Sequence, residues 1–244
     1  MDFKNANELL TLCEEQSISI SEVMRNREII TGECPAKEAD QKMVRVLEIM
    51  KEAARSPVEK PIRSMGGLIG GEAQKLAQHS ASGQGLCGEL LEKAITYAMA
   101  TLETNASMGL IVASPTAGSA GIVPGLLLAF QEVYHFSDKE IQQVLFNAGA
   151  VGYLAMRNAT VAGAVGGCQA EVGVASAMAA SAAVELMGGT PKQCLDAAST
   201  VLMNMLGTVM KKYNGIVTAD EIGLPVSSNG LVLPCGASGR WESK

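Results

Sequence analysis

The chain has 244 residues and a formal net charge of −6, and hydrophobic residues make up 48% of it while aromatic residues make up only 4%. This length allows one large domain or two small ones with a proper core. No run of Lys or Arg offers a basic patch, so the charge pattern argues against a nucleic-acid surface. The apolar residues are mainly Ala, Val, Leu, Ile and Met, and 26 glycines accompany them, which favours closely packed helices over sheets.

The N-terminal sequence indicates a cytoplasmic protein. The run MDFKNANELLTLCEEQ is polar and acidic, unlike a secretory signal, so the six cysteines are expected as free thiols rather than disulfides. The stretch 160–187 is long enough to resemble a membrane span. However, it contains Gln169 and Glu171 and little Leu, Ile or Phe. We therefore expect no membrane association, and a helix buried in a soluble core.

Residues 1–60 are expected to form an N-terminal helical segment. Ser19 and Glu22 have the spacing of a capping box, in which a hydroxyl and a carboxylate satisfy free N–H groups at a helix start. An apolar stripe with a period of 3.6 residues runs from Met43 to Ala54. We expect Ser56-Pro57 to end this helix, because the residue before a proline disfavours the α conformation.

Residues 61–207 are expected to form a helical catalytic core, in which glycine-rich loops alternate with helices of small residues. Two more capping boxes start helices at 137–140 and at 190–193. Residues 208–244 form a divergent or truncated tail that is polar and rich in turns, with GIV and GLVLP as candidate short strands. The predicted fold class is mainly α, a multi-helix globular catalytic domain with glycine-rich active-site loops.

Two motifs that suggest other chemistry are weak. The run from Gly83 to Gly88 matches the dinucleotide pattern G-x-G-x-x-G, but no strand is predicted before it, so a loop that starts a helix is favoured. The two histidines, His79 and His135, lie far apart, which argues against a zinc site of the HExxH type. His79, in a Ser- and Gly-rich loop, is either an acid–base candidate or a surface residue.

Four segments share one composition, which points to an active site. The runs SMGGLIGG, ETNASMG, PTAGSAGIVPG and RNATVAGAVGGCQAEVG each combine Ser, Thr or Asn with glycines that expose backbone N–H groups. Where such loops meet helix N-termini, they bind carboxylates or phosphates. The alternative is four tight turns between packed helices. The repetition, with a cysteine in the last segment, favours the active site.

In order and approximate spacing, these runs resemble the α chain of iron–sulfur L-serine dehydratase. NASMG, PTAGSAG, NAT and GGCQAEVG carry the resemblance, together with SMGGLIGGEA before them and GGTP to NMLG after them. It covers about residues 1–207. The resemblance implies an L-serine ammonia-lyase that works with a β chain and converts L-serine to pyruvate and ammonia.

The resemblance also implies a cofactor and a set of site residues. Family members hold a [4Fe–4S] cluster with three cysteines, and its open iron acts as a Lewis acid on the serine hydroxyl while a base removes the α-proton. Cys168 and Cys235 match cluster ligands, and Gln169 and Glu171 are either residues that orient the cluster's surroundings or structural hydrogen-bonding groups. The base remains unassigned. The matching loops supply five substrate-binding candidates: Ser64, Asn105, Ser107, Thr116 and Ser119.

The sequence departs from the family after Gly207. Met210 stands where the second cluster ligand is expected, and the segment that ends in Cys235 comes late. A thioether does not replace a thiolate in an ordinary cluster. The alternative is therefore a non-catalytic or inactive α-like module that binds a partner, unless another thiol such as Cys87 substitutes. Pyridoxal-dependent deamination stays open as a third reading, although no S-x-K-x-R-G segment is present.

Overall fold

The computed structural model describes residues 2–205 of the chain. These residues form ten α-helices and no strand, so the predicted mainly α fold is confirmed. The predicted strands GIV and GLVLP, with Met210 and Cys235, lie outside the described residues. In chain order the helices are α1 (Ala6–Gln16), α2 (Ile20–Thr31), α3 (Ala36–Glu59), α4 (Glu72–Ala81), α5 (Glu89–Ala106), α6 (Ile122–Tyr134), α7 (Asp138–Asn158), α8 (Gly163–Gly166), α9 (Cys168–Leu186) and α10 (Pro191–Met205).

The chain divides into two compact units. The first unit joins Met1–Gln41 to the segment that begins at Gln142, and the second unit is Lys42–Ile141. The first unit therefore contains α1, α2 and α8 to α10, and the second contains α4 to α6. Helices α3 and α7 each begin in one unit and end in the other. Each unit is described by itself below.

All three predicted capping boxes form. At each box the hydroxyl of the first residue accepts the N–H of the fourth, and the fourth side chain accepts the N–H of the first. Because these bonds satisfy N–H groups that the helix itself leaves unpaired, they fix the starts of α2, α7 and α10. The pairs are Ser19 with Glu22, Ser137 with Glu140, and Thr190 with Gln193.

Helix α3 continues past Pro57, so the prediction that Ser56-Pro57 ends this helix was wrong. A proline inside a helix removes the N–H that would bind the carbonyl four residues earlier. That carbonyl belongs to Ala53, and it accepts the hydroxyl of Thr104 at 2.9 Å instead. Because α5 supplies the missing donor, α3 keeps its last turn and ends at Glu59.

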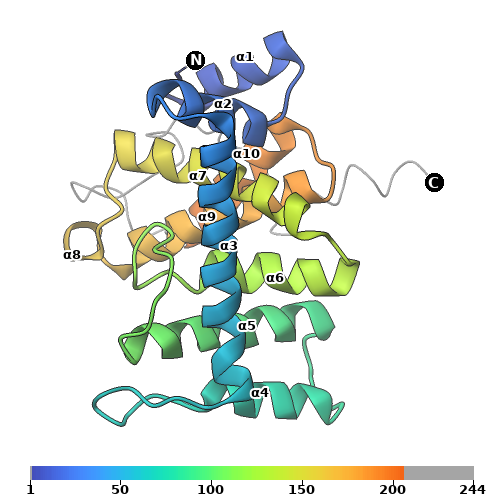
Figure 1. The fold of residues 1–244 in the computed structure, drawn as a ribbon, viewed down its shortest axis with the longest axis vertical. Coiled ribbons are helices and arrows are strands. Elements are labelled where there is room, and N and C mark those ends of the chain that lie inside the picture. Colours follow the sequence, from blue (N-terminus) through green and yellow to red (C-terminus); the bar gives the residue numbers. More distant parts are fainter. Residues whose placement is uncertain (1, 206–244) are drawn as a thin grey trace. The chain divides into compact units, whose positions relative to one another are not determined.

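The second unit is built around α5, which packs against both α4 and α6 (Figure 1). Small residues permit the close approach of α5 and α6. A Cβ on Gly125 of α6 would lie 2.8 Å from the carbonyl oxygen of Ala94 and 2.9 Å from the Cβ of Ala98. Both partners lie on α5, so only glycine fits at this crossing, and the axis of α6 lies close to that of α5.

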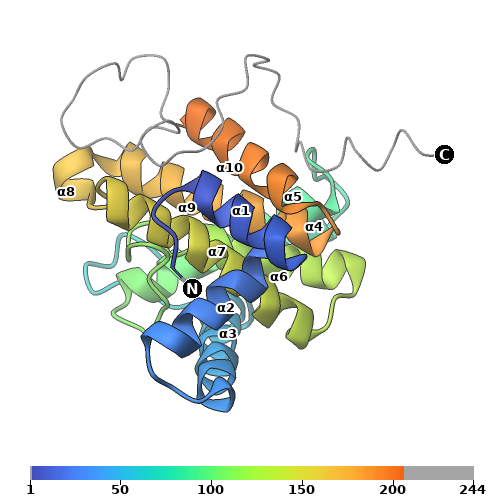
Figure 2. The same ribbon diagram turned by 90° about the horizontal axis from the view of Figure 1, so that it is seen from above.

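The first unit has α9 as its core helix, and α10 and α1 lie beside one another at its side (Figure 2). The apolar stretch 160–187 thus forms a short helix, α8, a break at Gly167, and the largely buried α9. Among the described residues no helix is long and apolar enough to cross a bilayer.

A buried polar network ties α7 to α9 within the first unit. Asn147 is fully buried, and its amide donates to Glu185 at 2.6 Å while its oxygen accepts the hydroxyl of Ser181 at 2.6 Å. Glu185 also accepts the N–H of Ser21 at 3.3 Å. Asn147, Ser181 and Ser21 are buried and Glu185 is partly buried, so the network fixes how the two helices pack.

Candidate functional site

Loop 64–71, which connects α3 to α4, is closed on itself by Ser64. The Ser64 N–H donates to the carbonyl of Ile69 at 2.8 Å, and its hydroxyl accepts the N–H of Ile69 at 3.2 Å. At the tip of the loop Met65 is 86% and Leu68 is 90% exposed. In the part of the chain that the structure describes, the N–H groups of Met65, Gly66 and Leu68 have no partner. The loop therefore offers unpaired donors to an anion.

The second glycine-rich loop, residues 107–121, draws three of the predicted substrate-binding residues together. The hydroxyls of Thr116 and Ser119 lie 3.1 Å apart, and Ser119, which is 1% exposed, also donates to the carbonyl of Ser114 at 3.3 Å. Asn105 donates its amide to the carbonyl of Ala117 at 3.0 Å. These polar groups hold the loop in shape, and their predicted contact with a substrate stays a prediction.

The C-terminal end of α5 anchors both loops. Glu103, on the last turn of α5, accepts the N–H of Ala73, the second residue after loop 64–71, at 2.8 Å. Two residues further on, Asn105 holds loop 107–121 through Ala117. Segments that are far apart in the sequence are therefore fixed to one short stretch of helix.

Buried polar atoms without a partner are concentrated here. Six such side-chain atoms occur in residues 2–205, and three of them belong to Glu103, Ser107 and Ser114. Ser107 follows the last residue of α5, and its N–H still donates to the carbonyl of Glu103, four residues earlier, so the two residues lie on the same side of this helix end. An unpaired buried polar group is costly, and in a native protein it needs an explanation such as a bound water, ion or ligand. Ser107 is one of the predicted substrate-binding residues.

The role of Glu103 was missed by the sequence reasoning, although the sequence holds a signal for it. Thr96, Ala100 and Glu103 follow one another at helical spacing, and the first two are buried. A glutamate that continues such a stripe must enter the core.

The pKa of Glu72, the first residue of α4, is affected by its neighbours in this region. Hydrogen bonds from the N–H groups of Glu72 itself and of Gly70, and contact with the Glu103 carboxyl, lower the pKa of Glu72 below its usual value.

Cys168 is the first residue of α9 and its side chain is exposed to solvent. No side chain caps this helix, and the Ala170 N–H binds the carbonyl of Gly167, so the N–H groups of Cys168 and Gln169 are the ones open to a negatively charged group. Before it, a Cβ on Gly167 would meet no atom within 4 Å. Gln169 is exposed and Glu171 is half-buried beside Gly163. Cys168 thus has the room that a bulky inorganic ligand needs.

The other described thiols differ in exposure. Burial raises the pKa of Cys13 to about 12, with a further contribution from Glu185, and burial likewise raises that of Cys194. Cys87 is exposed, and Cys34 is partly exposed. Residues 2–205 contain no group of three His, Cys, Asp or Glu side chains that could hold a metal ion. Cys168 belongs to the first unit, whereas loops 64–71 and 107–121 belong to the second.

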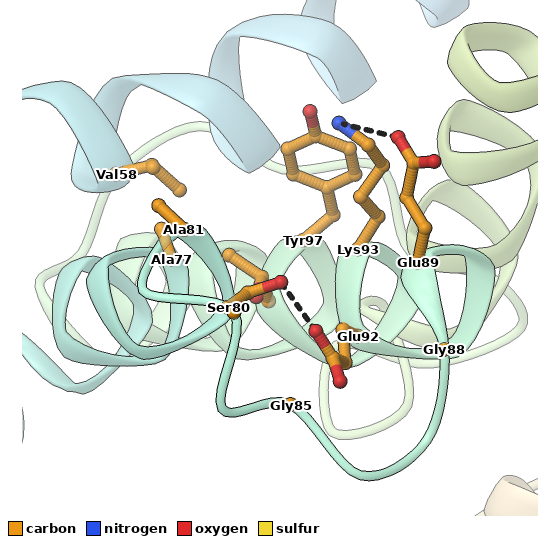
Figure 3. Close-up of a pocket in the computed structure, with 12 residues that line it drawn as sticks. Val58, Ala77, Ser80, Ala81, Gly85, Gly88, Glu89, Glu92, Lys93 and Tyr97 are labelled. Atoms are coloured by element: carbon orange, nitrogen blue, oxygen red, sulfur yellow. Dashed lines mark hydrogen bonds and ion pairs between the residues drawn. The ribbon is translucent and has the colours of Figure 1, made fainter.

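A cavity of about 580 Å³ lies beside the loop 83–88 in the second unit (Figure 3). Its charged groups already have partners. Glu92 accepts the hydroxyl of Ser80 and the N–H of Cys87, and Lys93 lies 3.9 Å from Glu89. The motif G-x-G-x-x-G follows α4 and not a strand, which agrees with the reading of this loop as a helix start. His79 lies on the last turn of α4 rather than in the expected loop, and it is exposed.

Comparisons with known proteins single out one family. The family model described as serine dehydratase alpha chain matches residues 15–218. The chain is 44% identical over 215 residues to the probable L-serine dehydratase, alpha chain, of Bacillus subtilis (strain 168), which covers 88% of this chain and 71% of that relative. It is 40% identical over 212 residues to the L-serine dehydratase, alpha chain, of Peptoniphilus asaccharolyticus, which covers 87% and 73%.

Some relatives are much longer. The chain is 35% identical over 224 residues to the L-serine dehydratase of Helicobacter pylori (strain ATCC 700392 / 26695). The match covers 88% of this chain but only 48% of that relative. About half of the longer protein therefore has no counterpart in the aligned part of this chain.

Proposed function

Since the chain belongs to the serine dehydratase alpha chain family, we propose that it is the alpha subunit of an L-serine ammonia-lyase, which converts L-serine to pyruvate and ammonia. The observation that carries the proposal is the family match over residues 15–218, which includes every glycine-rich loop of the described structure. The 44% identity to a relative named as a dehydratase favours this activity over a non-catalytic module.

The second unit supplies groups that suit an amino-acid substrate. The open N–H groups of loop 64–71 suit the substrate carboxylate, because backbone donors bind anions without adding charge. The unpaired hydroxyls of Ser107 and Ser114 are further groups that a polar ligand would satisfy. Asn105, Thr116 and Ser119 would act by holding loop 107–121 in the shape that binds the substrate.

We also propose a [4Fe–4S] cluster, with Cys168 as one ligand and Cys235 as another. The exposed thiol of Cys168, the open space at Gly167 and the uncapped start of α9 fit a negatively charged cluster. When bound, the cluster would supply a Lewis acid for departure of the serine hydroxyl. A third protein ligand has to come from another thiol, because Met210 occupies its expected place.

A second chain is part of the proposal. The Bacillus subtilis and Peptoniphilus asaccharolyticus relatives are named alpha chains, whereas the Helicobacter pylori relative is about twice as long as the segment that it shares with this chain. A β chain would supply the part of the longer protein that the match does not cover. We therefore expect full activity only when the two chains are combined.

The test is anaerobic reconstitution of the full chain with iron and sulfide, followed by visible spectroscopy and a pyruvate assay with L-serine and the β chain. Cluster absorbance and serine-dependent pyruvate are expected. Cys168→Ser should abolish both, because a hydroxyl is a poor replacement for a thiolate ligand. Cys87→Ser, which changes an exposed thiol of the other unit, is the matched control.

Each possible result of this experiment has its own interpretation. Loss of absorbance in Cys87→Ser would make Cys87 the third ligand. Absorbance without pyruvate would refute the proposed lyase activity while keeping the cluster. Pyruvate formation that survives in Cys168→Ser would refute the assignment of that ligand.

A further inference from the structure

Glu103 caps a helix other than its own. It lies on α5 with 1% of its surface exposed, and its Oε1 accepts the N–H of Ala73, the second residue of α4, at 2.8 Å. The N-cap position of α4 is Gly71, which has no side chain to do this. A helix start normally takes such a bond from a nearby residue. Here the acceptor comes from 30 residues further along the chain, so it fixes α4 to α5.

Glu72 extends this connection into the loop. Its Oε2 accepts the N–H of Gly70 at 2.7 Å, so Glu72 holds the last part of loop 64–71. The Glu103 carboxyl binds the residue next to Glu72 and contacts the Glu72 carboxyl, and this contact adds to the backbone hydrogen bonds that lower the pKa of Glu72. Glu103 therefore reaches both the first turn of α4 and, through Glu72, the loop before it.

The Glu103 side chain bridges α5 and loop 64–71. No cation pairs with Glu103 among the described residues, and its Oε2 is buried without a hydrogen-bond partner. Its Oε1 binds the Ala73 N–H at the start of α4, and Glu72, the residue before Ala73, binds the Gly70 N–H. These two bonds connect α5 to the last part of the loop.

We infer that Glu103 is a positioning residue for loop 64–71 in the proposed serine dehydratase, and that its bridge to the start of α4 holds the open N–H groups of this loop where they meet the substrate carboxylate. The inference rests on the proposed function. The inference extends the proposed function by giving a positioning role to Glu103, which is buried and therefore acts on the substrate only through the loop. Without the bridge, the loop would lose the attachment at its C-terminal end.

The test compares Glu103→Gln with Glu103→Ala in the full chain. Glutamine keeps an oxygen that can accept the Ala73 N–H and has nearly the same size and shape as glutamate, whereas alanine removes the acceptor. We expect Glu103→Gln to keep the KM for L-serine within about threefold of wild type, and Glu103→Ala to raise it by about tenfold or more, because the loop contacts the bound substrate. Amide hydrogen exchange of residues 64–73 should become faster only in Glu103→Ala.

Glu92→Ala is the matched control. Glu92 lies on the same helix and holds the other glycine loop, through Ser80 and Cys87. This variant should leave both the KM and the exchange of residues 64–73 unchanged. If Glu103→Gln lost as much activity as Glu103→Ala, or if exchange of residues 64–73 did not change in Glu103→Ala, the inference would be overturned. If the wild-type chain formed no pyruvate from L-serine, the proposed function would be refuted instead. The hydrogen-exchange measurement would still test whether Glu103 anchors loop 64–71.

Discussion

Replacement of Gly70 by alanine should disable loop 64–71 while leaving the helices folded. Gly70 has a φ of +141°, a conformation that residues with a side chain rarely adopt, and its N–H donates to Glu72. A Cβ at this position would lie 1.9 Å from the carbonyl oxygen of Ile62 and 2.8 Å from the Cα of Arg63. Both obstacles are backbone, so no side-chain rotation relieves them.

The size of the effect follows from these distances. Ordinary contact begins at 3.4 Å, so the loop backbone must move by about 1.5 Å, the difference from 1.9 Å. A misplacement of about 1 Å in a binding site costs on the order of 100-fold in rate. We therefore expect kcat/KM for L-serine to fall by about 100-fold, which is about 2.7 kcal/mol of transition-state stabilisation. The cost in folding stability should be about 1–3 kcal/mol.

Two glycines of the same loop serve as controls in the pyruvate assay. A Cβ on Gly66 would meet nothing within 4 Å and its φ is not positive, so Gly66→Ala should behave as wild type. Gly67 has the same open space but a φ of +70°, so Gly67→Ala should cost about 1–2 kcal/mol of stability. Wild-type kcat/KM in Gly70→Ala would refute the reasoning, because the loop would then not determine activity.

Two further predictions concern stability. Asn147→Ala removes a bond to a carboxylate and leaves a buried hydroxyl unpaired, so it should lower the free energy of unfolding in urea by about 3 kcal/mol, and a loss below about 1 kcal/mol would contradict this account. The hydrogen bond from Lys51 to Asp138 holds the pKa of that carboxyl below its ordinary value. The ion pair therefore stabilises the fold above the unfolded-state pKa, and its contribution is lost as the pH falls through the lower folded-state pKa. Asp138→Asn should be less stable than wild type at pH 7 by about 0.5 kcal/mol. As the pH falls below about 3.8, the free energies of unfolding of the two proteins should converge. A stability difference that persists at lower pH would contradict the assignment of the ion pair.

Features that depend on neighbours in the sequence could be predicted. The capping boxes at Ser19, Ser137 and Thr190 formed because both partners lie within one turn of the helix start. The mainly α class followed in the same way from small-residue composition and helical spacing. The loops were found by their shared composition, and the family match at residues 15–218 agrees with the resemblance that they suggested.

Features that depend on partners distant in the sequence could not be predicted. The end of α3 was predicted at Pro57, and the prediction failed because Thr104, 51 residues from Ala53, supplies the missing donor. Glu103 was overlooked for the same reason, since its partner Ala73 lies 30 residues away and the pairing exists only once α4 packs on α5. Cys235, which is predicted to bind the cluster together with Cys168, lies outside the described residues, so this pair of ligands stays a prediction.

The attachment of both glycine loops to the end of α5 constrains how this protein can change. Since Glu103 and Asn105 are two residues apart on one helix, one inserted residue before them would turn both side chains by about 100° around the helix axis. Both loops would lose their attachment in a single step. Length changes in the exposed connection around Gln84 leave that register untouched, so insertions and deletions among related chains should be tolerated there and purged from α5.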